Sequence, residues 1–217
     1  MVHFTFCSPI GKDSSHSPGA LHPPHLRPPN SGANTVGGGR HPVGSGFSPT
    51  IRSNRWAFVS RRVSDGSLVA WGNRFYGGRG CPTGSGFAAD IASTETAFVA
   101  RRQATGELAC WGSPSNGGSG CPTGTGFADV AATHGEDAGG AFAARRVDGS
   151  IHAWGASHNG GQGAPTGTGF VGRIGTTQSA FVARKADGRL VAWGESAQGG
   201  HGEPTDAGWG PTFASTR

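Results

Sequence analysis

The side chains with the strongest chemical character in this sequence are pairs of basic residues that recur at one position of an internal repeat. Each pair follows an apolar run, as in AFVARR over residues 97–102. A row of such cations would attract phosphate groups or an acidic protein face. Alternatively, each pair only solvates the end of a strand and discourages edge pairing, and the lack of interleaved aromatic residues favours this second role. The candidate anionic-partner residues are Arg61, Arg62, Arg101, Arg102, Arg145, Arg146, Arg184 and Lys185.

A second group of candidate binding residues lies in the loops that follow each Trp-Gly dipeptide. These loops, at residues 73–78, 113–118, 156–161 and 195–200, differ more between copies than the rest of the repeat. Varied loops on a constant frame are typical of recognition scaffolds, although drift in unconstrained loops is an equal alternative. The candidates are Arg74, Phe75, Tyr76, His158 and Glu195, with Phe75 and Tyr76 foremost because exposed aromatic side chains anchor protein interfaces.

No catalytic, cofactor or metal motif accompanies these residues. The sequence has no GxxxxGK[ST] phosphate loop, no G-x-S-x-G nucleophile elbow and no CxxC pair. Glu107, His152 and Glu195 each stand alone at their repeat position, so no base, nucleophile and orienting group are assembled. The sequence therefore predicts a non-catalytic protein without a cofactor or a metal site.

The chain has four cysteines, and we expect them to be small buried or half-buried thiols. Cys81 and Cys121 occupy the same repeat position, and Cys110 stands where the other copies have alanine. A disulfide needs Cα atoms within about 7 Å, and equivalent positions of neighbouring repeats are usually further apart.

The frame that must position these side chains is a four-fold repeat. Trp-Gly recurs at residues 71–72, 111–112, 154–155 and 193–194, in steps of 40, 43 and 39 residues. Each copy has two short apolar runs separated by a turn that usually contains Asp-Gly, which is a hairpin signal, and a glycine-rich loop follows. Recurrent Phe and Trp at fixed positions, beside small residues, predict strands that pack between neighbouring copies. The units lie near 47–86, 87–126, 127–169 and 170–208, with a partial unit at 209–217.

Composition separates residues 1–40 from this array. The segment holds six of the 14 prolines and four histidines without any periodicity, which predicts a disordered Pro/Gly/His-rich stretch before the repeats at 41–217. The net charge of +5 favours anionic partners without identifying one. No apolar run reaches the roughly 20 residues that span a bilayer, and no secretory signal is apparent, so a cytoplasmic or nuclear location is the default expectation.

The repeat resembles that of the regulator of chromosome condensation family, most closely its short-repeat bacterial members. The pattern AFVARKADGRLVAWG at residues 180–194, followed by a G-G-x-G loop, carries the resemblance over about residues 37–217. The resemblance implies an all-β β-propeller and a protein-binding role, and the four copies of the repeat predict a β-propeller-like array of about four blades that is partial or open. It also implies, as alternatives, guanine-nucleotide exchange on a small GTPase or association with chromatin or nucleic acid.

The number of copies bears on assembly. The family usually has seven blades, and an open array of about four exposes apolar faces at both ends. We therefore expect either a homo-oligomer or missing blades to complete the ring.

Overall fold

The structure, a computed structural model, describes residue 42, residues 44–135 and residues 139–210. The predictions made for residues 1–40, and for most of the partial unit at 209–217, lie outside the described residues.

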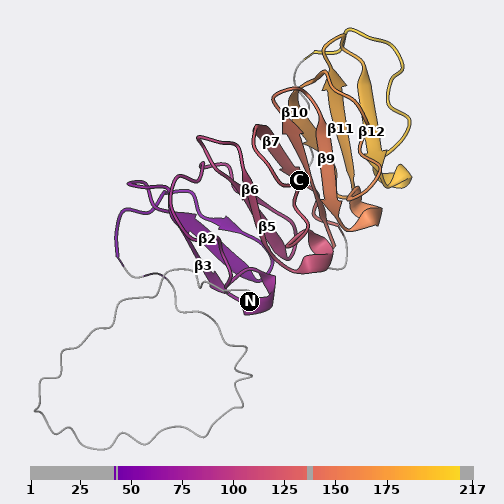
Figure 1. The fold of residues 1–217 in the computed structure, drawn as a ribbon. Helices are drawn as coiled ribbons and strands as arrows, with labels where there is room; N and C mark the ends of the chain where they lie inside the picture. Colours follow the sequence, from indigo (N-terminus) through magenta and orange to yellow (C-terminus); the bar gives the residue numbers. More distant parts are fainter. Residues whose placement is uncertain (1–41, 43, 136–138, 211–217) are drawn as a thin grey trace, which may run out of the picture.

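The described chain is an all-β array of four blades, each a three-stranded antiparallel sheet (Figure 1). The chain visits the strands of each sheet in order, so every blade is a meander. Blade 1 contains β1 (Arg52–Ser53), β2 (Ala57–Arg61) and β3 (Leu68–Gly72); blade 2 contains β4 (Ala92–Ser93), β5 (Ala97–Arg101) and β6 (Leu108–Gly112); blade 3 contains β7 (Phe127–Ala132), β8 (Ala141–Arg146) and β9 (Ile151–Gly155); blade 4 contains β10 (Phe170–Thr176), β11 (Ala180–Lys185) and β12 (Leu190–Gly194).

The predicted hairpin joins the second and third strands of every blade. In blade 1 the register pairs Phe58 with Trp71 and Arg61 with Leu68. The turn between these strands places Gly66 at a φ of 72°, a left-handed conformation that glycine adopts without a Cβ penalty. The same pairing places a Phe beside a Trp in each blade, with ring centroids 5.2–5.5 Å apart.

The four blades stack side by side, with blade 1 and blade 4 at opposite ends of the array (Figure 1). Small apolar side chains on one face of a blade pack against the Phe–Trp face of the following blade. We call each such contact between neighbouring blades a joint. At the joint between blades 1 and 2, blade 1 contributes Ala57, Val59 and Leu68, and blade 2 contributes Phe98, Ala100 and Trp111. The central strands β5 and β8 are therefore buried on both faces, as the sequence predicts.

Each joint is completed by the glycine-rich loop of the preceding blade. Trp111 Nε1 donates a hydrogen bond to the Gly77 carbonyl oxygen at 3.1 Å, and a Cβ on Gly77 would lie 2.6 Å from the Phe98 ring. The two later joints repeat this contact with Gly117 and Gly160. Glycine is required at this position because the loop backbone lies directly on the aromatic ring.

Blade 1 departs from the predicted pattern because no described blade precedes it. The sequence predicts that all four recurrent Phe side chains are packed between copies, and Phe98, Phe142 and Phe181 are fully buried. Phe58, however, is 46% exposed. Its face is the one that a preceding glycine-rich loop covers in the other blades.

The expectation of reduced thiols was wrong for the described cysteines. Cys110 in β6 forms a disulfide with Cys121, with their Cα atoms 6.1 Å apart, and none of the described cysteines is a free thiol. The sequence argument against a disulfide applied to equivalent repeat positions, such as Cys81 and Cys121, which lie one blade apart. The chain instead turns back after blade 2, so the segment that leads into blade 3 passes beside β6.

Candidate functional site

The predicted binding loops all lie along one rim of the array (Figure 1). Each loop forms a single-turn 3-10 helix that a left-handed glycine terminates, such as Gly77 at φ 96°. Their shared construction follows from the shared glycine pair in the sequence. The helices are η1 (Arg74–Tyr76), η2 (Pro114–Asn116), η3 (Ser157–Asn159) and η4 (Ser196–Gln198).

Each loop is held in place by a polar side chain that precedes the second strand of its own blade. The Thr133 hydroxyl donates to the Asn159 carbonyl oxygen at 2.9 Å and accepts a hydrogen bond from the Ala141 amide at 2.9 Å. Asn54 performs both tasks in blade 1. Sequence analysis missed the role of these polar side chains. Its signal was an Asn or Thr that recurs three or, in blade 3, eight residues before the apolar run, namely Asn54, Thr94, Thr133 and Thr177.

Three of the five predicted partner-binding residues lie together on blade 1. Phe75 is 61% exposed, and the Arg74 guanidinium lies over its ring at 4.5 Å from the centroid. Tyr76 is half-buried and its ring contacts Trp56, which is itself 47% exposed, at 5.9 Å between centroids. Arg55 lies over the Trp56 ring at 5.3 Å.

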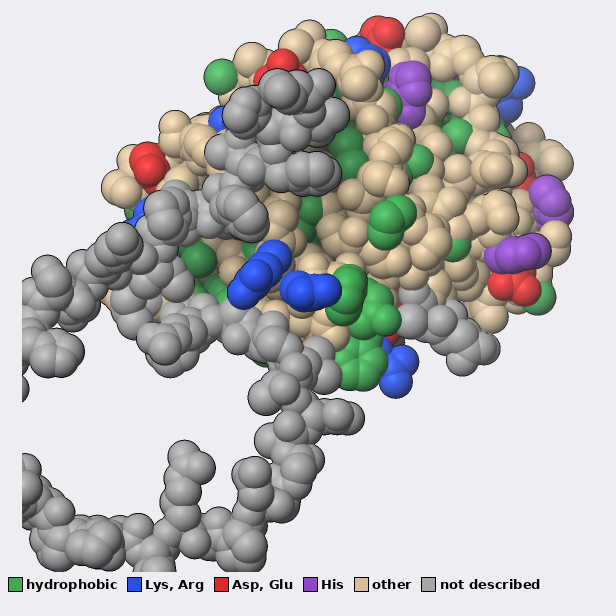
Figure 2. Space-filling view, turned by 60° about the horizontal axis from the view of Figure 1, so that its bottom comes forward, with side chains coloured by type: hydrophobic (Ala, Val, Ile, Leu, Met, Phe, Trp, Pro, Cys, Tyr) green, Lys and Arg blue, Asp and Glu red, His purple; other side chains and the backbone are tan. Residues whose placement is uncertain are grey.

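We call Arg55, Trp56, Arg74, Phe75 and Tyr76 the aromatic patch. Sequence analysis missed Trp56 and Arg55, which directly precede β2 and reach the rim only through the fold. A group of exposed hydrophobic side chains beside Lys and Arg side chains is visible in Figure 2. Large rings between cations, at the surface, have the composition of a protein-binding anchor.

His158 and Glu195 do not join the aromatic patch. Both are exposed, but His158 belongs to η3 and Glu195 precedes η4, so they lie on blades 3 and 4. The structure thus distributes the five predicted residues along the rim and gathers only those of blade 1.

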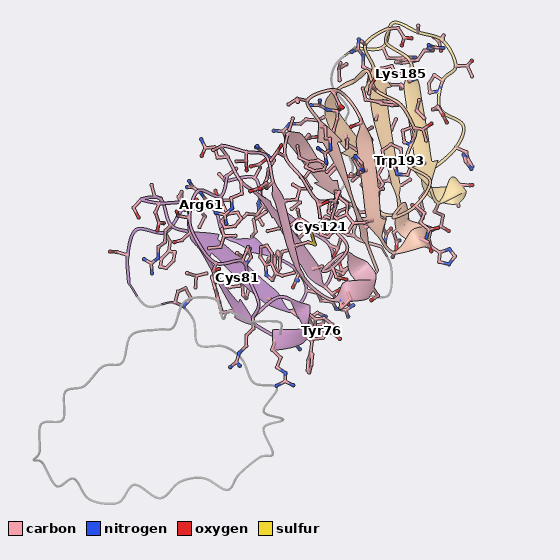
Figure 3. All side chains as sticks on the ribbon, in the orientation of Figure 1. Arg61, Tyr76, Cys81, Cys121, Lys185 and Trp193 are labelled. Atoms are coloured by element: carbon pink, nitrogen blue, oxygen red, sulfur yellow. A yellow bond between two sulfur atoms is a disulfide. The ribbon has the colours of Figure 1, made fainter. Side chains whose placement is uncertain are left out.

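The basic pairs lie at the opposite rim, as the labels of Arg61, Lys185 and Tyr76 show (Figure 3). The first cation of a pair often reaches the first strand of the following blade or the segment that leads into it. Arg61 Nε donates to the Phe87 carbonyl oxygen at 2.6 Å, and Arg145 Nε donates to that of Gly172 at 2.8 Å. Arg184 donates to the Trp209 carbonyl oxygen in the same manner. Arg101 instead forms an ion pair with Asp90 at 3.1 Å.

The second cation of each pair covers an aromatic ring of its own blade. Arg102 lies 4.2 Å from the Phe87 centroid and donates hydrogen bonds to the Ser85 and Thr83 carbonyl oxygens. Equivalent pairs place Arg62 over Phe47, Arg146 over Phe127 and Lys185 over Phe170. The sequence interpretation that aromatic residues are missing near the pairs was therefore wrong, because the rings come from a segment 15 or 19 residues upstream in the chain.

Carboxylates of the hairpin turns lie at this basic rim as well. The Ser67 amide donates to Asp65 at 2.9 Å, and the Ser150 amide and hydroxyl donate to Asp148 at 2.8 and 2.7 Å. These hydrogen bonds hold the pKa of Asp65 and of Asp148 below the ordinary value. The turns therefore carry negative charge at neutral pH next to the cations.

A polar groove, which the sequence did not predict, runs along the first strands of the four blades. Its volume is about 960 Å³, and it is lined by the segments around β1, β4, β7 and β10. Different side chains face it at one repeat position, namely Glu95, His134 and Gln178. This variation at an otherwise regular position is the signal that could have revealed the groove.

No known family profile and no curated protein matches this sequence. Solved structures do match in fold. The entire ectodomain of the Physcomitrella patens receptor kinase CR4 superposes with a TM-score of 0.51 at 16% identity, over 66% of this chain and 40% of that one. The CRINKLY WD40 ectodomain of the Arabidopsis thaliana receptor kinase ACR4 superposes with a TM-score of 0.50 at 14% identity, over 76% of this chain and 55% of that one.

These matches define the class of structure. The four meander blades and the similarity to WD40 ectodomains make the described chain a partial, four-bladed β-propeller, as the repeat predicts. The chain spans only about half of these ectodomain structures. Among the described residues, none lies in a helix that is long and apolar enough to cross a membrane, and no cluster of metal-ligating side chains is found.

Proposed function

We propose that this chain is a non-catalytic repeat scaffold that binds another protein through the aromatic patch on blade 1. The observation that carries the proposal is the exposure of Phe75 (61%) and Trp56 (47%) beside Arg55 and Arg74. Aromatic and arginine side chains dominate the energetics of protein interfaces because they bury large areas with few rotatable bonds.

The other three blades support the choice of this patch. At the position of Phe75 they carry Ser115, His158 and Ala197, on loops of the same construction. The scaffold does not need an aromatic side chain there, because three blades fold the loop without one. An exposed phenylalanine at a position that the fold leaves free is better explained by recognition than by packing.

The contacts of the basic rim favour a protein partner over a nucleic acid. All eight cations of the basic pairs are half-buried and already engage a carbonyl oxygen, a carboxylate or a ring of the same chain. Phosphate binding would compete with these contacts. The nucleic-acid and nucleotide-exchange functions remain predictions that rest on charge and on the resemblance of the repeat.

The test is quantitative affinity capture from an extract of the source organism, with three immobilised proteins: the wild type, Phe75→Ser and Ser115→Ala. Phe75→Ser introduces the residue of blade 2 and should leave stability unchanged, because the side chain is exposed. We expect a partner protein that binds the wild type and Ser115→Ala equally and binds Phe75→Ser at least about tenfold more weakly.

Salt separates this proposal from the alternatives. An aromatic contact should persist when salt is raised from about 0.1 to 0.5 M, whereas nucleic-acid binding weakens steeply with salt. Equal capture by the wild type and Phe75→Ser, or a bound fraction that consists of nucleic acid and is lost in salt, would contradict the proposal. Accelerated nucleotide release from a small GTPase would support the exchange function instead.

A further inference from the structure

The two ends of the array are complementary halves of the joint that the molecule forms three times internally. At each internal joint, a glycine-rich loop lies on the Phe–Trp face of the next blade. Blade 1 presents such a face at one end of the array. Blade 4 presents such a loop at the other end.

The face on blade 1 is assembled, but no described loop covers it. Phe58 and Trp71 stack with centroids 5.5 Å apart, as the pairs inside the joints do. Phe58 is nevertheless 46% exposed, whereas Phe98 is fully buried. Within the described residues, the Trp71 indole N–H has no hydrogen-bond partner, although each of the three later Trp residues donates to a loop carbonyl oxygen. We call Phe58 and Trp71 the socket.

The loop on blade 4 is assembled, but it covers no aromatic face among the described residues. Gly199 has a φ of 94°, close to the 96° and 89° of Gly77 and Gly117. A Cβ on Gly77 or Gly117 would strike the next blade's Phe ring at 2.6 or 2.5 Å, but a Cβ on Gly199 would meet no atom of the described residues within 4 Å. We call the loop around Gly199 the knob.

We propose that the knob of one copy docks into the socket of a second copy, in a head-to-tail contact that reproduces the internal joint. The internal joints supply the argument for the occupant, since they show which backbone and which glycine this kind of aromatic face accepts. In the complex, Trp71 donates its indole N–H to the Gly199 carbonyl oxygen of the second copy, and Phe58 lies under that glycine. A contact of this kind closes into a ring or extends into a filament, depending on the rotation between copies.

The experiment is sedimentation velocity over a range of concentrations, with Gly199→Trp and Gly202→Trp as a matched pair. Gly202 lies in the same loop with a similar φ of 83°, and the equivalent Gly80, Gly120 and Gly163 meet no atom within 4 Å although they adjoin the joints. We expect the wild type and Gly202→Trp to associate. Gly199→Trp should raise the dissociation constant about 10–100-fold, because the indole overpacks the contact.

A mixing experiment establishes the direction of the contact. A Phe58→Arg copy lacks the socket and keeps the knob, whereas a Gly199→Trp copy lacks the knob and keeps the socket. Each copy alone should sediment as a monomer, and the mixture should form a one-to-one dimer that grows no further. Circular dichroism checks that both variants are folded.

Three results would overturn the proposal. The wild type could remain a monomer at all concentrations, as when another segment of the chain covers the socket. Gly199→Trp could associate as well as Gly202→Trp does, which would place the contact elsewhere. The mixture could also remain monomeric although each partner is folded and the wild type associates. None of these results bears on the aromatic patch, because Phe75 belongs to neither the knob nor the socket.

Discussion

The internal joints and the open face of blade 1 are built from the same residue types but have different surroundings. At the joint between blades 1 and 2, Phe98 and Trp111 are buried beneath the Gly77 loop. On blade 1, Phe58 and Trp71 form the same stack, no described loop lies above them, and Phe58 stays half-exposed. The comparison shows that a blade folds its aromatic face by its own hairpin register. Burial of that face, and hence most of its stabilisation, comes from the neighbouring blade.

The largest expected effect on stability comes from adding a single methyl group at an internal joint. Gly117→Ala places a Cβ about 2.5 Å from the Phe142 ring at a φ of 89°. Left-handed strain of about 1–2 kcal/mol and overpacking of about 1–3 kcal/mol should together lower the free energy of unfolding by about 2–5 kcal/mol. Gly199→Ala is the matched control, because it has a similar left-handed φ and its Cβ meets no atom of the described residues within 4 Å. Urea denaturation of both variants at low protein concentration measures the difference. Equal destabilisation of the two variants would contradict the predicted contact of the Gly117 loop with the Phe142 ring.

The second prediction concerns the covalent link between blade 2 and the segment that leads into blade 3. Replacing Cys110 and Cys121 together by alanine opens a loop with a sequence separation of 11 residues. Loss of the cross-link should lower the free energy of unfolding by about 3 kcal/mol, because the unfolded chain regains entropy. The other blades already carry alanine at the position of Cys110, so the residue itself fits. The measurement is the melting temperature of the double variant compared with that of the wild type. An unchanged melting temperature would contradict a stabilising role of the disulfide.

A smaller effect is expected from a polar atom on blade 1. Ser60 is 2% exposed, and its hydroxyl oxygen has no hydrogen-bond partner among the described residues. The other three blades have Ala100, Ala144 and Ala183 at this position. Ser60→Ala should therefore raise the free energy of unfolding by about 1 kcal/mol, since it removes an unsatisfied buried group. Ala100→Ser is the reciprocal variant and should destabilise, and chemical denaturation of the pair tests both signs.

The smallest effect lies at the hairpin turns, away from the joints. The pKa of Asp148 is lowered by hydrogen bonds from Ser150, so its contribution to stability is complete above the unfolded-state pKa and is lost as pH falls through the lower folded-state value. Asp148→Thr introduces the residue that blade 2 has as Thr105. The variant should lose less stability than the wild type between about pH 5 and pH 2. Parallel pH dependences of the two proteins would contradict the prediction.

The sequence predicted the elements that depend on local and periodic information. The turn at Asp65-Gly66 and the recurrent Trp-Gly position set a hairpin whose register pairs Phe58 with Trp71 in blade 1 and the equivalent residues elsewhere. The period near 40 residues predicted a stacked β array. It also identified the loops that carry Arg74, Phe75 and Tyr76, because these loops vary on a constant frame.

Contacts between segments distant in the chain were decided only by the tertiary structure. Three contacts join residues at different repeat positions. They are the aromatic ring under the second cation of each basic pair, the Cys110–Cys121 disulfide and the contact between the Trp56 and Tyr76 rings. A repeat pattern compares equivalent positions with one another, so it cannot show which different positions meet. The exposure of Phe58 has the same origin, because burial of an aromatic face depends on the blade beside it and not on the residues within it.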